Sequence, residues 1–134
     1  MFHIADCSTN CGLTLMANTH VCIPKFDIEA MLTTIQEHGV THTLLVPTMI
    51  NMLANFPGVE TYDCSSLRTI YYGASPMPEA VLAKAMQVFP TCEFIQGYGM
   101  TETSPLITML AGKDRKSTRL NSSHIQKSRM PSSA

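Results

Sequence analysis

The feature that most constrains the fold is an alternation of apolar, β-branched runs with amphipathic helical segments. The runs at residues 19–23, 41–46, 67–72 and 92–96 have the length and composition of buried strands. Helical patterns separate these runs, and crossover connections of that kind join parallel strands. The sequence therefore predicts an α/β fold, with a mostly parallel sheet and flanking helices.

The helical segments carry start and stop signals. Asp27 can cap a helix whose apolar residues share one face, and Gly39 can end that helix. Pro47 suits the first turn of the next helix, and a third helix is expected at residues 78–88. Each expected strand after the first is thus preceded by a helical segment of ordinary length.

Length and composition indicate one soluble domain. A chain of 134 residues with 45% hydrophobic residues is long enough for a core, and no apolar run reaches the ~18 residues of a membrane span. The start of the chain lacks the basic region and the apolar region that make up a secretory signal. We therefore expect a cytoplasmic protein, or one peripheral to a membrane within a longer parent enzyme.

The five cysteines are expected to be reduced thiols, because their number is odd and no two are spaced as Cys-x-x-Cys. Cys7 and Cys11 stand near His3 and His20, a grouping that could suggest a metal site. Thiol ligands usually come closer together, and a second matching pair is missing. The sequence therefore favours no metal at these cysteines.

The end of the chain differs in character from the rest. Residues 1–113 contain four basic and nine acidic residues, a net charge of -5, whereas residues 114–134 contain five basic and one acidic residue, a net charge of +4. The second segment is rich in Ser, Arg and Lys, lacks apolar periodicity, and resembles the translation of a sequencing-library adapter. We expect it to be a disordered read-through artefact; a natural basic tail is the alternative, and a nucleic-acid partner is not expected.

The strongest chemical signal follows the last expected strand and reads Gln96-Gly97-Tyr98-Gly99-Met100-Thr101-Glu102, before Thr103-Ser104-Pro105. Its glycines let backbone approach a ligand, its aromatic ring offers a stacking face, its hydroxyl can donate to phosphate, and its carboxylate can hold a hard cation. This combination suits a nucleotide with its metal. A glycine-bearing turn from a strand to a helix, as expected here, also occurs in many proteins without a nucleotide.

A second turn of small residues follows the preceding strand and reads Tyr71-Tyr72-Gly73-Ala74-Ser75-Pro76-Met77-Pro78. Ligands of parallel sheets bind beyond the carboxyl ends of the strands, where both turns are expected. The two turns would then line one crevice. Two ordinary loops are the alternative that the residues alone leave open.

These two turns, together with Met1-Phe2-His3 at the start, resemble the motifs of the AMP-binding, or adenylate-forming, superfamily. That superfamily contains acyl-CoA synthetases, coumarate-CoA ligases, luciferases and peptide-synthetase adenylation domains. The resemblance extends from Met1 to about Ala111, and residues 41–49 look most like bacterial medium-chain or long-chain fatty acid-CoA ligases. It implies that residues 1–113 form part of the large N-terminal region of such an enzyme.

The resemblance also implies roles for individual residues. Tyr98 would stack on adenine, Gln96 would bond to its amino group, and Thr101 would bond to phosphate oxygens. Glu102 would bind Mg2+, and Thr101, Glu102 and His3 would act in catalysis. The full nucleotide-binding set would be Gly73, Ala74, Ser75, Gln96, Gly97, Tyr98, Gly99, Met100, Thr101 and Glu102, and the acyl pocket would include His3, Ile4 and Gly97.

The implied reaction joins a carboxylic acid to ATP, with Mg2+, and then transfers the acyl group to coenzyme A. The family's phosphate loop, ribose-binding Asp and catalytic Lys are expected to lie outside this sequence, so the chain by itself is expected to be inactive. Two alternatives are open: a piece of an amino-acid adenylation domain, and a nucleotide-binding module without catalysis.

Overall fold

The computed structural model describes residues 3–103 and 106–112, so Met1, Phe2, the Ser104-Pro105 pair and the expected adapter segment at 114–134 lie outside the described residues. The helices are α1 (Ile4–Leu15), α2 (Ile28–His38), α3 (Pro47–Ala54) and α4 (Glu79–Val88). The strands are β1 (His42–Leu45), β2 (Thr69–Tyr72), β3 (Glu93–Tyr98) and β4 (Thr108–Leu110). Two short 3-10 turns complete the described elements, η1 (Val59–Thr61) and η2 (Thr101–Thr103).

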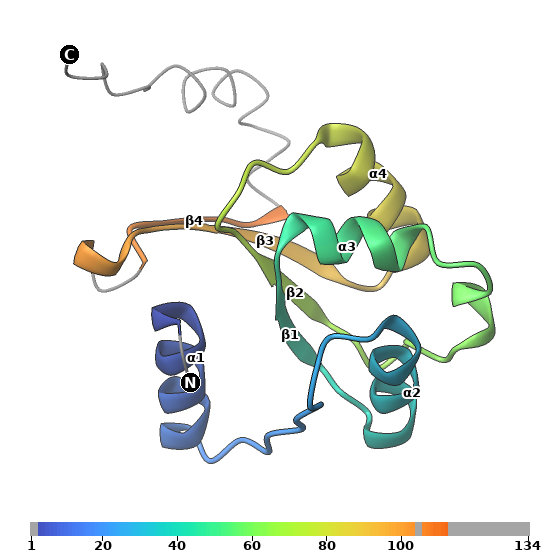
Figure 1. The fold of residues 1–134 in the computed structure, drawn as a ribbon, viewed down its shortest axis with the longest axis horizontal. Helices are drawn as coiled ribbons and strands as arrows, with labels where there is room; N and C mark the ends of the chain where they lie inside the picture. The colour runs from blue at the N-terminus through green and yellow to red at the C-terminus, as the bar shows by residue number, and fades with distance from the viewer. Residues whose placement is uncertain (1–2, 104–105, 113–134) are drawn as a thin grey trace.

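The four strands form one sheet in the order β1-β2-β3-β4. Strands β1, β2 and β3 are parallel, and β4 is antiparallel to β3 (Figure 1). Tyr72 at the end of β2 pairs with Gln96 of β3, which places the residues after β2 beside the last residues of β3. The predicted α/β fold with a mostly parallel sheet is confirmed.

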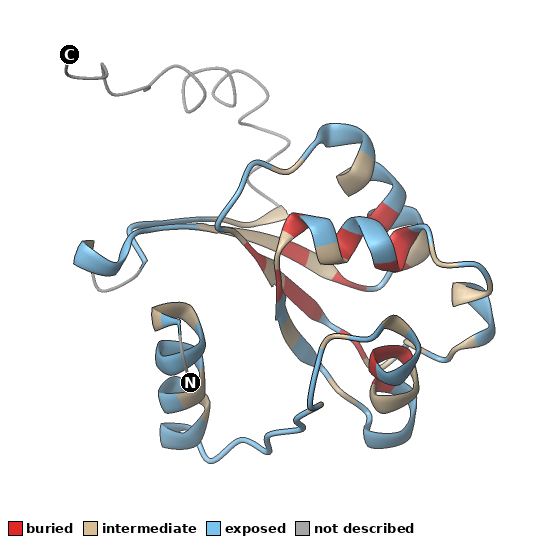
Figure 2. Cartoon of the chain, viewed as in Figure 1, coloured by how far each residue is buried: buried red, intermediate tan, exposed pale blue. Residues whose placement is uncertain are grey.

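The core lies between one face of the sheet and helices α2, α3 and α4 (Figure 2). Ile70 and Phe94, which are paired across β2 and β3, are each 1% exposed. Leu32 of α2 and Ile50 of α3 are fully buried against the same cluster. The strand positions alternate between this covered face and an opposite face on which Leu44 is exposed, as the period of two in a strand requires.

Helix α2 begins and ends where its sequence signals predict. The Asp27 carboxylate accepts a hydrogen bond from the Ala30 backbone N–H at 2.9 Å, which satisfies one of the free donors at the helix start. Gly39 follows the helix with a φ of 60°, a left-handed conformation that glycine adopts without steric cost. Pro47 is likewise the first residue of α3.

One prediction about the first part of the chain is wrong, and one helix there was not predicted. Residues 19–23 form no strand, and all but Ile23 are exposed, because they have no neighbouring strand with which to pair. Helix α1 was not expected, since its sequence is rich in Ser, Thr, Asn and Gly, which are poor helix formers. None of its residues is buried, and it stands apart from α3 and α4 in Figure 1. No helix within the described ranges combines the length and hydropathy needed to cross a membrane.

A second prediction needs correction at the candidate site. The last parallel strand does not end at Gln96 but continues through Tyr98, so the first three residues of the motif belong to β3. The motif then leads through η2 into β4, not into an α-helix. The turn is thus the tip of an antiparallel hairpin, which Figure 1 shows projecting from the sheet.

Candidate functional site

The two glycine-containing turns meet at the carboxyl ends of β2 and β3. A Cβ atom built on Gly73 would lie 2.5 Å from the carbonyl oxygen of Gly97, closer than real Cβ atoms approach any atom. The backbone of the first turn therefore lies directly against the backbone of the second. Glycine is required at position 73 because any side chain would push the two turns apart.

Gly97 has a second close neighbour. A Cβ atom built there would lie 3.1 Å from Cδ1 of Leu106 and 4.0 Å from the Tyr72 carbonyl oxygen. Leu106 was not among the residues singled out in the sequence, because it follows the motif and only the hairpin brings it back over β3. The Leu106 side chain thus lies over the Gly97 backbone, so closely that a Cβ atom at position 97 would crowd it.

The first turn has a strained backbone at one position. Ala74 has a φ of 67°, in the left-handed region that residues with a Cβ atom seldom occupy. Such conformations cost about 1–3 kcal/mol and are concentrated at sites of function. Ala74 and Ser75 are both exposed, so the strained turn presents its atoms to solvent beside Gly97.

The side chains of the second turn are accessible to a ligand. Tyr98 is 53% exposed, which leaves its ring available for stacking, and its carbonyl oxygen accepts a hydrogen bond from the Ile107 N–H at 2.8 Å. Gln96 is half-buried and pairs with Leu110 of β4. Thr101 and Glu102 are exposed at the hairpin tip.

The turn itself is held by Thr103, a residue that the sequence analysis did not assign a role. Its hydroxyl oxygen accepts a hydrogen bond from the Met100 N–H at 3.0 Å and donates to the Met100 carbonyl oxygen at 2.9 Å. The signal that could have identified it is its position as the third residue of η2, three residues after Met100, where a side chain can reach back to the backbone that precedes the turn.

His3 and Ile4 lie at the start of α1, far in the sequence from the two turns at Gly73 and Gly97. The Nδ1 atom of His3 accepts a hydrogen bond from the Ala5 N–H at 3.4 Å, so its ring acts as the helix cap. No hydrogen bond in the described part of the chain joins His3 to β3. The nucleotide-binding candidates of the two turns are therefore brought together, whereas the acyl-pocket grouping of His3 and Ile4 with Gly97 stays a prediction.

The turn offers one carboxylate, that of Glu102, toward a hard cation such as Mg2+. No group of three or more His, Cys, Asp or Glu side chains within residues 3–103 and 106–112 is placed to hold a metal ion. Mg2+ usually keeps several waters and takes one or two carboxylates with substrate phosphates, so a single exposed carboxylate such as that of Glu102 fits this ion. The residues thus suit a metal that arrives with its nucleotide.

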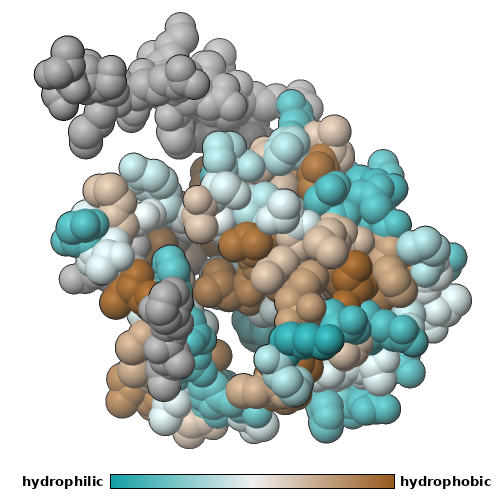
Figure 3. All heavy atoms as spheres, viewed as in Figure 1, coloured by the Kyte–Doolittle hydropathy of each residue, from teal (hydrophilic) through white to brown (hydrophobic). Residues whose placement is uncertain are grey.

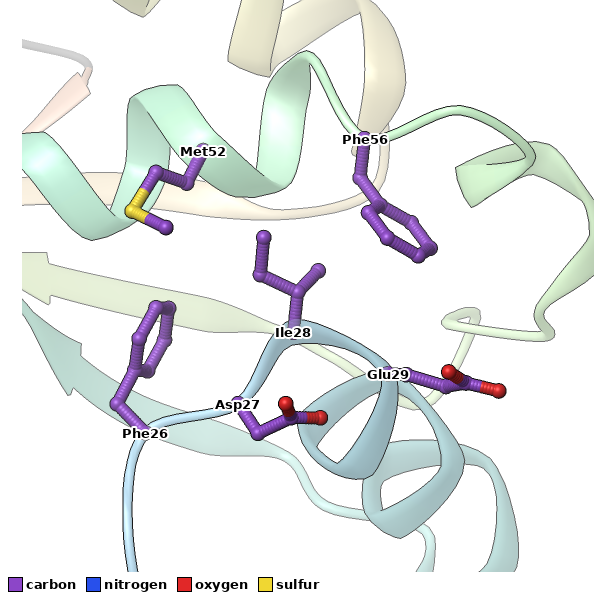
Figure 4. Close-up of a pocket in the computed structure, with 6 residues that line it drawn as sticks. All are labelled: Phe26, Asp27, Ile28, Glu29, Met52 and Phe56. Atoms are coloured by element: carbon purple, nitrogen blue, oxygen red, sulfur yellow. The ribbon is translucent and has the colours of Figure 1, made fainter.

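A separate apolar hollow of about 240 Å3 lies where the start of α2 faces α3, and none of the candidate nucleotide residues lines it. Ile28 points toward α3 between Met52 and Phe56, and the carboxylates of Asp27 and Glu29 point away from these side chains (Figure 4). Hydrophobic residues gather over the middle of the face that Figure 3 shows, with hydrophilic ones around them. The hollow borders the hydrophobic core, because three of its lining residues are half-buried against the core: Phe26, Ile28 and Phe56.

Taken together, the mostly parallel sheet and the two joined turns define an α/β protein with a candidate ligand site beyond the carboxyl ends of adjacent strands. The chain belongs to the AMP-binding enzyme family, whose model matches residues 1–127.

Relatives in this family include ligases for different acids. The chain is 41% identical over 102 residues to the medium/long-chain-fatty-acid-CoA ligase FadD8 of Mycobacterium tuberculosis, covering 76% of this chain and 18% of that protein. It is 36% identical over 124 residues to 4-coumarate-CoA ligase 2 of Narcissus pseudonarcissus, covering 91% of this chain and 22% of that protein. The chain thus spans about a fifth of the length of these relatives. Because the relatives include ligases of coumarate and of fatty acids, membership of the family does not by itself select a fatty acid as the substrate.

Solved structures show the same fold. The N-terminal domain of FACL13 from Mycobacterium tuberculosis superimposes with a TM-score of 0.80 at 28% identity, over 88% of this chain and 29% of that one. The O-succinylbenzoate coenzyme A synthetase MenE of Bacillus subtilis, solved in complex with ATP and a magnesium ion, superimposes with a TM-score of 0.74 at 28% identity, over 87% of this chain and 23% of that one.

Proposed function

We propose that this chain supplies part of the ATP site of a carboxylic acid-CoA ligase, with a fatty acid as the expected acid. The observation that carries the proposal is the backbone contact between Gly73 and Gly97, which joins the two turns at one edge of the sheet. Tyr98 follows Gly97 in β3 and is exposed, and Thr101 and Glu102 are exposed at the tip of the same hairpin. Family membership and the fatty-acid and coumarate ligases among the relatives support the same function.

The adenine would be held by shape and stacking. Gly73, Ala74 and Ser75 offer backbone along one edge of the base, and the absence of a side chain at Gly73 permits close approach. The exposed ring of Tyr98 offers a stacking face, and the half-buried Gln96 has an amide oxygen that can accept from the adenine amino group.

The triphosphate would bind at the hairpin tip, which includes Gly99 and Met100. Attack by a substrate carboxylate oxygen on the α-phosphorus forms the acyl-adenylate and breaks the bond to pyrophosphate. The Thr101 hydroxyl can donate to a phosphate oxygen, and the Glu102 carboxylate can hold Mg2+, which supplies positive charge where negative charge develops. The thiol of coenzyme A then attacks the acyl carbonyl, and AMP leaves.

The acyl group would lie on the other side of the same strand. Gly97 has no side chain to obstruct the pocket, but Cδ1 of Leu106 lies 3.1 Å from the position of a Cβ atom on Gly97, so the Leu106 side chain would have to move aside for an acyl chain to lie there. His3 and Ile4 are proposed to approach this pocket from α1. The half-buried Ile4 adds apolar surface at that helix start.

Nucleotide binding by the chain tests this proposal. Titration calorimetry with ATP and Mg2+ should show binding, and Glu102→Gln should weaken it about tenfold, because the amide keeps the shape and loses the charge that holds the cation. Glu60→Gln is the matched control, since Glu60 also occupies the middle of a three-residue 3-10 turn, η1. Equal loss in both variants, or no binding by the unaltered chain, would contradict the proposal.

Catalysis requires a second experiment. We expect no ATP-pyrophosphate exchange by the chain alone, because it spans only about a fifth of its relatives' length and catalysis depends on groups held together in one geometry. A longer coding sequence that contains this chain should catalyse exchange with a fatty acid. Exchange only with coumarate or an amino acid would overturn the expected acid, and binding without exchange for any acid would favour a non-catalytic nucleotide module.

A further inference from the structure

The loop that carries Thr101 and Glu102 is closed by three hydrogen bonds between the residues on either side of it. The Met100 N–H donates to the Thr103 hydroxyl oxygen at 3.0 Å, and that hydroxyl donates to the Met100 carbonyl oxygen at 2.9 Å. The Thr103 N–H donates to the same carbonyl oxygen at 3.0 Å. Two of the three bonds depend on the hydroxyl group of Thr103.

The second 3-10 turn in the described part of the chain, η1, shows which of these bonds is found in η2 alone of the two turns. In η1, Thr61 donates from its N–H and from its hydroxyl to the Gly58 carbonyl oxygen, at 2.9 and 2.7 Å. In η2, Thr103 makes both of the equivalent bonds and also accepts from the N–H of the cap residue. This third bond satisfies a backbone donor in the way that the third residue of a capping box does.

Among the described residues, no burial in the core holds the η2 loop. None of its residues is buried, Met100 is 45% exposed, and Thr101 and Glu102 are exposed. The hydrogen bond from Ile107 to the Tyr98 carbonyl oxygen closes the hairpin below the loop but leaves the loop itself free of core contacts. Among the described residues, the hydrogen bonds that close this loop are those that Thr103 makes with Met100.

We propose that the Thr103 hydroxyl is a positioning group, which fixes the loop so that Thr101 and Glu102 face the phosphates and Mg2+ of one bound nucleotide. This inference rests on the proposed function, because it concerns the same site. Without the hydroxyl the loop keeps a single 3-10 bond and samples other conformations. The nucleotide then has to order the loop on binding, and the ordering free energy weakens its affinity.

Three variants test this inference. Thr103→Ala removes the hydroxyl, Thr103→Ser keeps it, and Thr61→Ala removes the corresponding hydroxyl from η1. A net hydrogen bond corresponds to about a fivefold change in an equilibrium. We therefore expect Thr103→Ala to speed exchange of the Met100 amide proton, measured by NMR without nucleotide, by about fivefold. Thr103→Ser keeps the hydroxyl and Thr61→Ala changes a different turn, so both variants should exchange the Met100 amide proton within about twofold of the rate in the unaltered chain.

Affinity supplies the second readout. Thr103→Ala should weaken the binding of ATP with Mg2+ by about fivefold and the binding of ATP in EDTA by a smaller factor, because without the cation only the direct contact of Thr101 with phosphate is affected, whereas Glu102 acts through the cation. Thr103→Ser should restore both values. Equal affinities in the Ala variant and the unaltered chain, or equal losses with and without Mg2+, would overturn the positioning role.

The two proposals fail in different ways. If the unaltered chain does not bind ATP with Mg2+, the proposed function is contradicted, and with it the role of Thr103 toward a nucleotide. Whether the hydroxyl stabilises the loop is still tested by the exchange rate of the Met100 amide proton, because that measurement needs no ligand. An unchanged rate in Thr103→Ala would overturn that stabilising role.

Discussion

Gly73→Ala should destabilise the fold through a backbone contact and not through a buried side chain. The new Cβ atom would lie 2.5 Å from the Gly97 carbonyl oxygen and 3.4 Å from the Gly97 carbonyl carbon. Real Cβ atoms essentially never lie within 3.0 Å of another atom, so the two turns must separate by at least about 0.5 Å. Both contacting atoms are backbone, and no rotamer change can relieve the clash.

The expected loss follows from the cost of inserting one carbon into a packed position. Overpacking typically costs 1–3 kcal/mol, so we expect the free energy of unfolding to fall by about 2 kcal/mol. For a domain of this size, that loss lowers the melting temperature by roughly 10 °C. Urea unfolding followed by far-UV circular dichroism measures the first value, and a thermal melt measures the second.

Gly12→Ala is the control for Gly73→Ala. Gly12 lies in helix α1, and a Cβ atom built on it has no atom within 4 Å. Because alanine is a better helix former than glycine, this variant should be as stable as the unaltered chain or more stable by up to about 1 kcal/mol. If Gly73→Ala unfolds within about 0.5 kcal/mol of the unaltered chain, the strands accommodate the methyl group and the close-contact reasoning is refuted.

Three further predictions concern the core, a helix end and a buried thiol. Phe94→Ala should lower the free energy of unfolding by about 3–5 kcal/mol in a urea titration, because Phe94 is 1% exposed at the centre of the sheet; a loss below about 1 kcal/mol would contradict its core role. Gly39→Ala should cost about 1–2 kcal/mol in the same titration, since its φ of 60° is unfavourable for alanine, and an unchanged midpoint would refute this. Burial raises the pKa of the Cys92 thiol from 9.0 to about 11, so the folded chain keeps a proton that the unfolded chain loses and stability should fall as the pH rises from 9.0 towards about 11; urea midpoints with the same pH profile in Cys92→Ala would contradict this.

Local signals predicted the elements that are held by local interactions and by the core. Asp27 and Gly39 mark the ends of α2 because each satisfies the backbone at a helix terminus. The run at residues 67–72 became β2 because its residues are paired on both sides and packed against α3 and α4. In these cases the propensity of the segment and its tertiary surroundings favour the same structure.

The failures occurred where tertiary context decides the structure. Residues 19–23 have strand propensity, but a strand forms only against a partner, and these residues are exposed. The motif after Gln96 was expected to lead into a helix, as in most βα units, whereas pairing of Gly97 with Met109 turns it into a hairpin. That pairing involves a strand of three residues, β4, which is too short to give a periodic signal of its own.

The candidate site is shaped largely by the backbone, and the side chains proposed to bind the nucleotide contribute little to the fold. The contact of Gly73 with Gly97 and the left-handed Ala74 are main-chain arrangements, and the turn beyond them is closed by the Thr103 hydroxyl on the backbone of Met100. Tyr98 and Glu102, in contrast, are exposed. Replacing either by alanine should therefore change the free energy of unfolding by no more than about 0.5 kcal/mol while weakening nucleotide binding, whereas Gly73→Ala should reduce both. A loss of stability in Glu102→Ala comparable to that in Gly73→Ala would show that the side chain, and not the backbone contact, supports the turn.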